Sequence, residues 1–143
     1  MKHLQILNKT GQKKEFFKSI IVKSGQNVNF ETITQINSSQ TRGNISIKAV
    51  VLENGILTLK GIIKVSPNLN RIEAFLKHAI LLVGKNSAAV SIPELEIESH
   101  DVKVSHSSTI GQIDFEQLFY LMSRGFSHQE SVKLIINSFL SSN

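Results

Sequence analysis

The five histidines are the first candidates in this chain for metal binding or proton transfer. Imidazole binds transition metals and moves protons near neutral pH. The histidines are His3, His78, His100, His106 and His128. His100 and His106 are the closest pair in sequence, yet on a straight strand rising about 3.3 Å per residue they would stand about 20 Å apart. They could share a metal ion only if the chain turned between them, so a structural or surface role is the simpler interpretation of each histidine alone.

The acidic side chains and the missing thiols narrow the chemistry further. Glu94, Glu96 and Glu98 alternate with Leu95 and Ile97, which places three carboxylates on one face of a strand. Such a face could collect cations, but an exposed acidic strand face is the simpler interpretation. The chain has no cysteine. This excludes disulfides, thiolate zinc sites, cysteine nucleophiles and an iron–sulfur cluster ligated by cysteines of this chain alone.

No enzyme motif emerges from the remaining residues. The segment 84–87 has a Gly-Lys pair but lacks the upstream glycine and the adjacent hydroxyl of a phosphate-binding loop. No Gly-x-Ser-x-Gly elbow is present. A carbohydrate-active enzyme would need paired acids and aromatic sugar platforms, and the chain has no Trp and one Tyr. We therefore expect no catalytic activity.

Length and composition predict one compact soluble domain. The chain has 143 residues, of which 41% are hydrophobic and 19% charged. The segment Met1–Thr10 contains no continuous apolar core of the kind found in signal peptides. We expect a cytoplasmic protein without membrane contact.

Charge is distributed unevenly along the chain. Residues 1–72 hold eleven Lys or Arg and three acids, whereas residues 73–143 hold five and eight. Such asymmetry can mark a nucleic-acid face, but few of the cations are Arg and only 6% of residues are aromatic. A solvated lysine face is the better interpretation, and we expect no nucleic-acid partner.

The elements that must position these residues are mostly β-strands. From Ile20 to about His106, short apolar runs alternate with Gly, Asn, Ser and Lys at intervals of ten to twenty residues. Two architectures fit: an antiparallel sandwich or barrel, and a parallel β-helix with coils of about twenty residues. Asn54-Gly55 is a hairpin signal and favours the first. Continuous apolar runs such as 80–83 suit strands buried on both faces, so the pattern leaves both architectures open.

A helical hairpin is expected over residues 114–140. Asp114 and Gln117 form a capping-box pattern, and Gly125 stands where the first helix would end. Ser127 and Glu130 begin a second helix in the same way. Apolar residues share one face in each helix. These are Phe115, Leu118, Phe119 and Met122 in the first, and Val132, Ile135, Ile136 and Phe139 in the second.

Several ordered motifs resemble the C-terminal core of SufB and SufD, the scaffold subunits of the SUF iron–sulfur assembly machine. The match is nearly ungapped over residues 93–125, and a weaker likeness extends back to Gly55 and forward to Phe139. The pieces that carry it are Pro93–Ile97 (PELEI), Asp101–His106 (DVKVSH), Gly111–Asp114, Gln117–Leu121 and Ser123–Gly125.

This resemblance implies a mainly β fold, with a right-handed parallel β-helix over residues 1–113 and a C-terminal helical part over residues 114–143. It implies association of two subunits through their β-helix ends, here with a SufB-like subunit or as a homodimer. It also implies docking of a SufC-like ABC ATPase on the helices. That surface would map to Phe119, Tyr120, Arg124 and Gly125.

Departures from the family pattern limit what can be transferred. His78 stands where the SufB branch has a cysteine that receives sulfur, and Ser107 replaces a glutamate. His106 matches the family's motif histidine, so it is the first candidate metal ligand, and His78 is the second. The resemblance thus implies a SufD-like, non-enzymatic scaffold or accessory subunit, with an iron–sulfur cluster shared with a partner chain as its one expected cofactor. The alternative is a reduced β-helix protein that dimerises or binds an ATPase without carrying a cluster.

Overall fold

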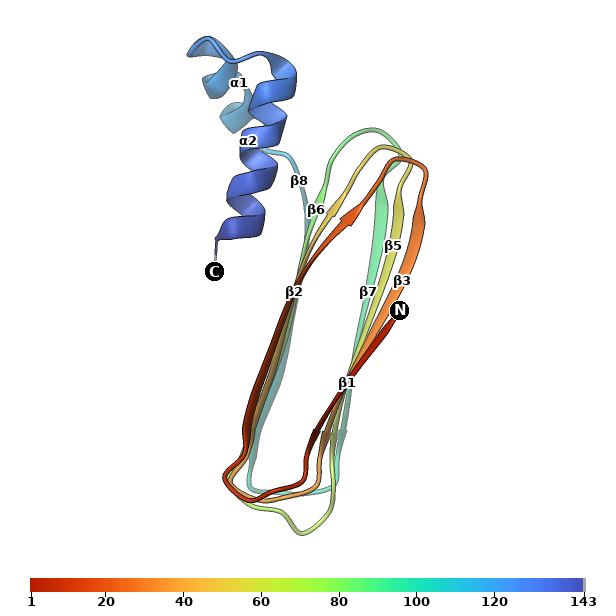
Figure 1. Ribbon diagram of the computed structural model, residues 1–143, viewed down its shortest axis with the longest axis vertical. Helices are drawn as coiled ribbons and strands as arrows, with labels where there is room; N and C mark the ends of the chain where they lie inside the picture. Colours follow the sequence, from red (N-terminus) through yellow and green to blue (C-terminus); the bar gives the residue numbers. More distant parts are fainter. Residues whose placement is uncertain (143) are drawn as a thin grey trace.

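The chain forms a β-solenoid of four coils that is followed by two helices (Figure 1). The structure is a computed structural model that describes residues 1–142. Asn143, the last residue of the expected helical part, lies outside the described residues. The strands are β1 (Lys2–Leu7), β2 (Lys13–Val22), β3 (Asn27–Ile36), β4 (Arg42–Val51), β5 (Ile56–Val65), β6 (Ile72–Leu82), β7 (Ala88–Ile97) and β8 (Val102–Gln112). The helices are α1 (Phe115–Ser123) and α2 (His128–Ser141).

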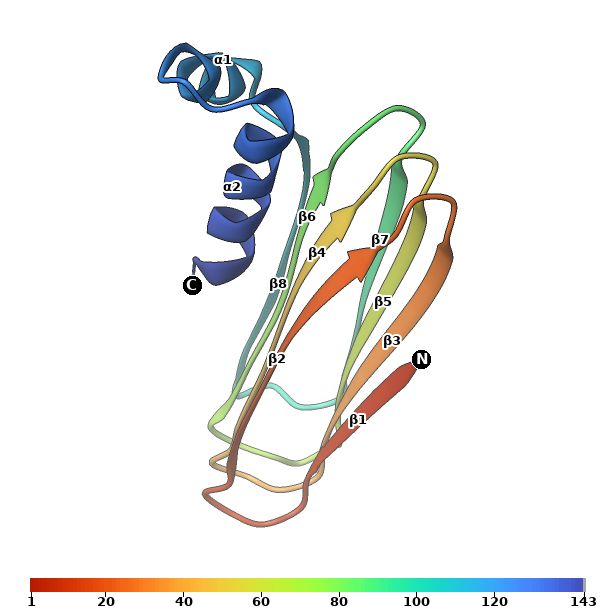
Figure 2. The ribbon, with the colours of Figure 1, turned by 45° about the horizontal axis from the view of Figure 1, so that its top comes forward.

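The strands form two sheets that face each other (Figure 2), and the paired strands within each sheet run parallel. One sheet has the order β1-β3-β5-β7 and the other the order β2-β4-β6-β8. Consecutive strands therefore alternate between the sheets, and each successive pair makes one coil. This confirms the β-helix and excludes the antiparallel sandwich or barrel.

Each coil is longer than the expected twenty residues. Lys2 lies opposite Glu31, 29 positions later, and Ile56 lies opposite Ala88, 32 positions later. The shorter prediction was wrong because one coil contains two strands of about ten residues and two corners. The turn signals in the sequence therefore mark half-coils.

The corners stack residues that hold a left-handed backbone. Gly25, Asn54 and Asn86 occupy equivalent corners with φ angles of 73°, 56° and 56°. The Asn86 side-chain amide donates a hydrogen bond to the Asn54 oxygen at 3.1 Å. Asn54-Gly55 joins β4 to β5, which lie in different sheets, so it is a corner and not a hairpin. The hairpin prediction was wrong because a hairpin turn and a solenoid corner both need a positive φ at this asparagine, so the Asn-Gly pair does not distinguish them.

Aliphatic side chains fill the space between the two sheets, most densely in the central coils. Each of these side chains, when removed from water, stabilises the fold by about 1.5–3 kcal/mol. Those that are completely or almost completely buried include Leu7, Val22, Ile36, Ile47, Leu57, Leu59, Ile63, Ile72 and Leu76.

Both helices begin at the predicted N-cap residues, but within residues 1–142 only the second has the predicted capping box, because Asp114 caps the Glu116 amide and does not pair with Gln117. The Asp114 carboxylate accepts a hydrogen bond from the Glu116 amide at 2.9 Å, and Ser127 and Glu130 form a reciprocal capping box. The apolar stripe of α2 packs on the outer face of the β2-β4-β6-β8 sheet. The buried residues there are Val50, Leu81 and Val83, and the α2 residues against them include Val132, Ile135, Ile136 and Phe139. Neither helix within residues 1–142 is long and apolar enough to cross a membrane.

A buried lysine fastens the end of α2 to the solenoid. Lys48 lies on the outer face of β4 and is only 4% exposed. Its ammonium donates hydrogen bonds to the Phe139 carbonyl and the Ser142 hydroxyl, both at 2.9 Å, and lies 5.6 Å from the centre of the Phe139 ring. A cation here pairs with the free carbonyls and the negative end of the helix dipole. Burial, with the charge of Lys77 adding, lowers the pKa of Lys48.

Candidate functional site in the last coil

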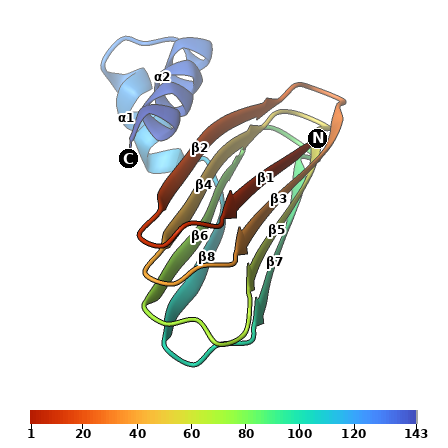
Figure 3. The ribbon, with the colours of Figure 1, turned by 60° about the horizontal axis from the view of Figure 1, so that its bottom comes forward.

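The last coil leaves two long strand edges uncovered. In the part of the chain that the structure describes, β7 pairs only with β5, and β8 pairs only with β6. The outer edges of these strands, 10 and 11 residues long, therefore carry free backbone N–H and C=O groups. Figure 3 shows β7 and β8 at the end of the stack opposite β1 and β2. Such edges are templates for pairing with another chain.

The inner face of this coil carries no Lys, Arg, Asp or Glu and is partly exposed. Register with the buried positions of β5 and β6 assigns alternate residues of both strands to the inside. These are Ser91, Pro93, Leu95 and Ile97 of β7, and Val102, Val104, His106, Ser108 and Ile110 of β8. Leu95 is 38% exposed and Ile110 is 45% exposed. The mouth of the solenoid is thus lined by apolar groups, hydroxyls and an imidazole.

His78 lies just inside this mouth, on β6. It is 1% exposed, and its Nδ1 lies 2.8 Å from the Ser91 hydroxyl of β7. Its Nε2 is buried and has no hydrogen-bond partner within residues 1–142. Gly61 faces this ring, because a Cβ at that position would meet the Leu76 side chain within 2.9 Å and His78 Cε1 at 3.2 Å. The glycine therefore leaves the room that both side chains occupy.

Burial keeps the His78 ring neutral at physiological pH. Desolvation, with the neighbouring His106 adding, lowers the pKa of His78 to about 4. A neutral imidazole with a free ring nitrogen is the form that binds metal ions. The same low pKa means that His78 does not carry a proton to give away near pH 7.

His106 is the exposed neighbour of His78 at the mouth. It lies opposite Leu76, while His78 lies opposite Ser108, so the two histidines are diagonal neighbours on adjacent strands. The structure therefore brings together the two histidines singled out by the sequence. Two imidazoles are an incomplete ligand set, and no group of three or more His, Asp or Glu within residues 1–142 is placed to hold a metal ion.

The other three histidines lie away from this mouth. His3 stacks on Phe16 in the first coil, with ring centres 3.5 Å apart. His100 lies at the corner before β8, and His128 begins α2. The positions of these three histidines therefore agree with the structural or surface role expected from the sequence.

The acidic strand face is partly neutralised by the neighbouring strand. Glu94 forms an ion pair with Lys60 at 3.1 Å, and Glu96 forms one with Lys64 at 3.0 Å. Both pairs lie on the outer face between β5 and β7. The carboxylates thus act as the exposed, charged exterior that the alternation predicts.

A second surface lies on α1. Phe115 and Phe119 are both 77% exposed, and Tyr120 is also exposed beside them. The Arg124 guanidinium lies 5.2 Å from the centre of the Tyr120 ring. The predicted single apolar face of α1 is thus divided, because Leu118 turns into the protein while the two phenylalanines stay in solvent. Gly125, with φ 100°, ends this surface.

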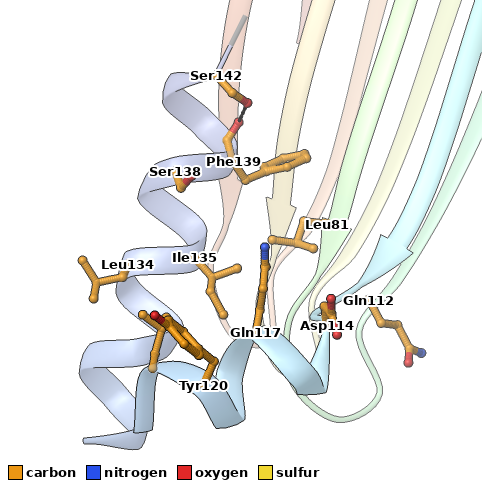
Figure 4. Close-up of a pocket in the computed structure, with 11 residues that line it drawn as sticks. Leu81, Gln112, Asp114, Gln117, Tyr120, Leu134, Ile135, Ser138, Phe139 and Ser142 are labelled. Atoms are coloured by element: carbon orange, nitrogen blue, oxygen red, sulfur yellow. Dashed lines mark hydrogen bonds between the residues drawn. The ribbon is translucent and has the colours of Figure 1, made fainter. Parts of the chain in front are cut away.

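A groove of about 620 Å³ lies where α1 and α2 meet the ends of β6 and β8 (Figure 4). Tyr120 of α1 and Leu134 of α2 lie along one side, and Leu81 and Phe139 lie toward the solenoid. Tyr120 therefore belongs to both the groove and the exposed face of α1.

Comparison with known proteins identifies this arrangement. A family model described as "SUF system FeS cluster assembly, SufBD core domain" matches residues 3–139, which include nearly the whole solenoid, all of α1 and most of α2. The chain belongs to the SufBD core domain family. The resemblance inferred from the sequence motifs is thereby confirmed.

Curated relatives of the family are much longer than this chain. The iron–sulfur cluster assembly protein SufD of Escherichia coli is 38% identical over 92 residues, which are 64% of this chain and 22% of that protein. A SufBD family protein of Galdieria sulphuraria is 33% identical over 99 residues, 69% of this chain and 45% of the relative. A SufBD family protein of Synechocystis is 24% identical over 125 residues, which are 87% of this chain and 26% of that relative. The chain thus spans less than half the length of these relatives.

The SufBD motifs gather around the two surfaces described above. Pro93–Ile97 is the end of β7, Asp101–His106 leads into and forms the first half of β8, and Gln117–Leu121 lies in α1. Sequence reasoning missed Ser91, the partner of His78, and Lys48, the clamp on α2. Neither could be found from spacing, because each meets its partner only through the coil register or the docking of α2.

Proposed function

We propose that this chain is a SufD-like, non-enzymatic scaffold or accessory subunit in iron–sulfur cluster assembly, and that its last coil handles the iron or the cluster as cargo. The observation that carries the proposal is the meeting of His78 and His106 at the open mouth of the solenoid. A role in iron–sulfur cluster assembly is supported by membership of the SufBD family and by the similarity to the cluster assembly protein SufD.

The chemistry of this mouth suits iron better than sulfur. Imidazole nitrogen binds iron, but it cannot carry a persulfide as a cysteine does. The neutral His78 needs no proton loss before it binds, and Ser91 holds the ring in place. Because only two imidazoles meet here, the remaining ligands would come from another chain.

That other chain would cover the last coil. The free edges of β7 and β8 offer backbone hydrogen bonds to a second solenoid end, and the inner face, which carries no Lys, Arg, Asp or Glu, offers apolar contact. A SufB-like subunit or another copy of this chain would fit. Either would extend the two sheets and enclose the histidine pair.

The helices would bind a SufC-like ABC-type ATPase. Phe119, Tyr120, Arg124 and Gly125 form a surface of exposed aromatic and cationic groups, as found in the energetic centres of interfaces. Lys48 fixes α2 to the sheet, so force applied to the helices would reach the solenoid.

Anaerobic reconstitution tests the cargo site. The protein is incubated with ferrous iron and sulfide and then separated by size, with mass and visible absorbance read together. We expect colour to elute with a dimer, to be lost in His106→Ala, and to persist in His100→Ala, whose histidine lies at the preceding corner. Equal melting temperatures of the two variants would confirm that the loss is specific.

A colourless dimer would favour the second candidate, an interaction protein that dimerises or binds an ATPase without a cluster. The observation that favours this second candidate is that no three potential metal ligands come together within residues 1–142. Colour retained in His106→Ala would also overturn the proposed ligand role.

A second experiment tests the ATPase surface. Phe119→Asp should abolish binding to a purified SufC-like subunit in calorimetry and leave the circular dichroism spectrum unchanged, because Phe119 is exposed. Phe17→Asp is a matched control, since Phe17 is also an exposed phenylalanine but lies on β2. Equal binding by both variants would remove α1 from the interface.

A further inference from the structure

We propose that the first coil is a closed end of the solenoid, because Lys14 and Lys18 point into its interior and keep the strands of other chains from adding to β1 and β2. This end of the stack lies opposite the candidate site in the last coil. The proposal therefore does not depend on a role in cluster assembly.

The first coil has long strand edges that call for protection. Within residues 1–142, β1 pairs only with β3 and β2 pairs only with β4, so the outer edges of six residues of β1 and ten of β2 are unpaired (Figure 3). Large apolar side chains are exposed on the outer faces of these strands, among them Leu4, Phe17 and Ile21. A long edge with apolar side chains is a template for association unless the protein blocks it.

The inner face of β2 carries two lysines at positions where the later coils carry no charge. Lys14 and Lys18 each begin a column of inner residues that runs through β4, β6 and β8. The later members of the two columns are Gly43, Ala74 and Val104, and Ile47, His78 and Ser108. No inner position of the strands β3 to β8 holds Lys, Arg, Asp or Glu. Inward lysines are therefore particular to the first coil.

Side chains from both sheets meet across the mouth of the first coil. The Lys18 ammonium lies 5.6 Å from the centre of the Phe30 ring, which belongs to the facing sheet. His3 of β1 stacks on Phe16 of β2, with ring centres 3.5 Å apart. Burial, with the charge of Lys18 adding, lowers the pKa of His3, which agrees with an ammonium close to that ring. The first mouth is thus spanned by its own side chains.

A further pair of strands on this end would remove the two lysines from water. Neighbouring strands of a sheet lie about 4.8 Å apart, so added strands would cover Lys14 and Lys18, which are now half-buried. Burial of an ammonium group without an acidic partner is strongly unfavourable. Inward-pointing charges are one of the means by which natural sheets protect their edges. The last coil lacks such charges, so the two ends of the solenoid differ in kind.

Replacement of the inward lysines tests this barrier. Lys14→Val combined with Lys18→Val continues the aliphatic interior to the end of the stack. Lys13→Val combined with Lys23→Val is the matched control, because it removes the same charge from exposed positions. In analytical ultracentrifugation the mass should rise about twofold or more over that of the natural protein, for the inward pair only. Equal masses for the two pairs of substitutions would overturn the proposal.

Hydrogen exchange locates the new contact. In the inward pair, amides of β1 and β2 should gain protection at high protein concentration and lose it on dilution. Circular dichroism of the dilute protein shows that the variant is folded. If the inward pair precipitates, Lys18→Val alone takes its place, with Lys23→Val as its control. A rise in mass without protection in β1 and β2 would place the contact elsewhere and overturn the proposal.

Charge reversal separates the presence of a charge from its sign. Lys14→Glu combined with Lys18→Glu keeps two charged groups at the inner positions. We expect this variant to keep the mass of the natural protein, because a buried carboxylate opposes an added strand as a buried ammonium does. Association of this variant through β1 and β2 would show that inward charge is not the barrier.

Discussion

The central coils and the last coil share one repeat but use their inner positions differently. In β5, the inward residues Leu57, Leu59 and Ile63 are completely or almost completely buried. At equivalent positions β7 carries Ala89, Ser91 and Leu95, none of which is fully buried. The backbone register is the same in both strands. The difference shows that the middle coils are packed more tightly than the last coil, where the proposed site opens to solvent.

The largest expected effect comes from removing the same side chain in each region. Leu59→Ala should lower the free energy of unfolding by about 2–5 kcal/mol, because it leaves a cavity in a packed interior. Leu95→Ala should cost under about 1 kcal/mol in the monomer, because Leu95 is already partly in water. Urea titration of both variants, at concentrations where the protein is monomeric, gives the comparison. Equal losses would mean that the last coil is packed as tightly as the central ones.

The second prediction concerns the pH dependence that His78 imposes on the fold. Its folded pKa is about 4 and its ordinary value is 6.5. Between these values the unfolded chain binds a proton at His78 and the folded chain does not. The free energy of unfolding should therefore fall as the pH is lowered from 6.5 to 4, by about 3 kcal/mol in total, since one pKa unit corresponds to about 1.4 kcal/mol.

Chemical denaturation across this pH range measures the effect. His78→Gln should flatten the profile. An identical slope in His78→Gln and in the natural protein would show that His78 titrates normally and that the mouth of the solenoid is wetter than its burial indicates.

Much of this architecture could be predicted from the sequence, and the failures have a common cause. Strand positions and both helix caps depend on local patterns, such as the Ser127 and Glu130 pair, and these were found. The coil length and the role of Asn54-Gly55 depend on which strands pair, and local patterns do not contain that information. A positive φ at an asparagine serves a hairpin and a solenoid corner equally well.

The candidate site was predictable to a similar degree. His78 and His106 were singled out through family motifs, but 28 positions separate them in the sequence, and only the register of β6 with β8 makes them neighbours. Ser91 lies on β7 in the facing sheet, and its hydroxyl meets His78 across the interior of the solenoid. Lys48 was unpredictable, because a lysine on an outward strand position normally lies in solvent, and only the docking of α2 buries it.

The third prediction concerns the joint between the solenoid and the helices. Lys48→Met removes two hydrogen bonds at the end of α2 and the favourable charge at the negative end of its dipole. We expect a loss of about 1–2 kcal/mol, confined to the helices. Hydrogen exchange should accelerate in the last turn of α2 and stay unchanged in β4. Lys77→Met, on the neighbouring strand, is the control, and equal exchange in the two variants would remove Lys48 from this role.

The smallest expected effect concerns the ion pairs that join the last coil to the one before it. Lys64 and Glu96 lie 3.0 Å apart, with side chains 37% and 53% exposed. Solvent screens such a pair, and a double-mutant cycle with Lys64→Ala and Glu96→Ala should give a coupling of about 0.5 kcal/mol or less, decreasing with added salt. Backbone pairing between β5 and β7 would then hold the last coil in place. A coupling above about 1.5 kcal/mol would indicate instead that charge, and not the shared backbone register, fixes the open end of the solenoid.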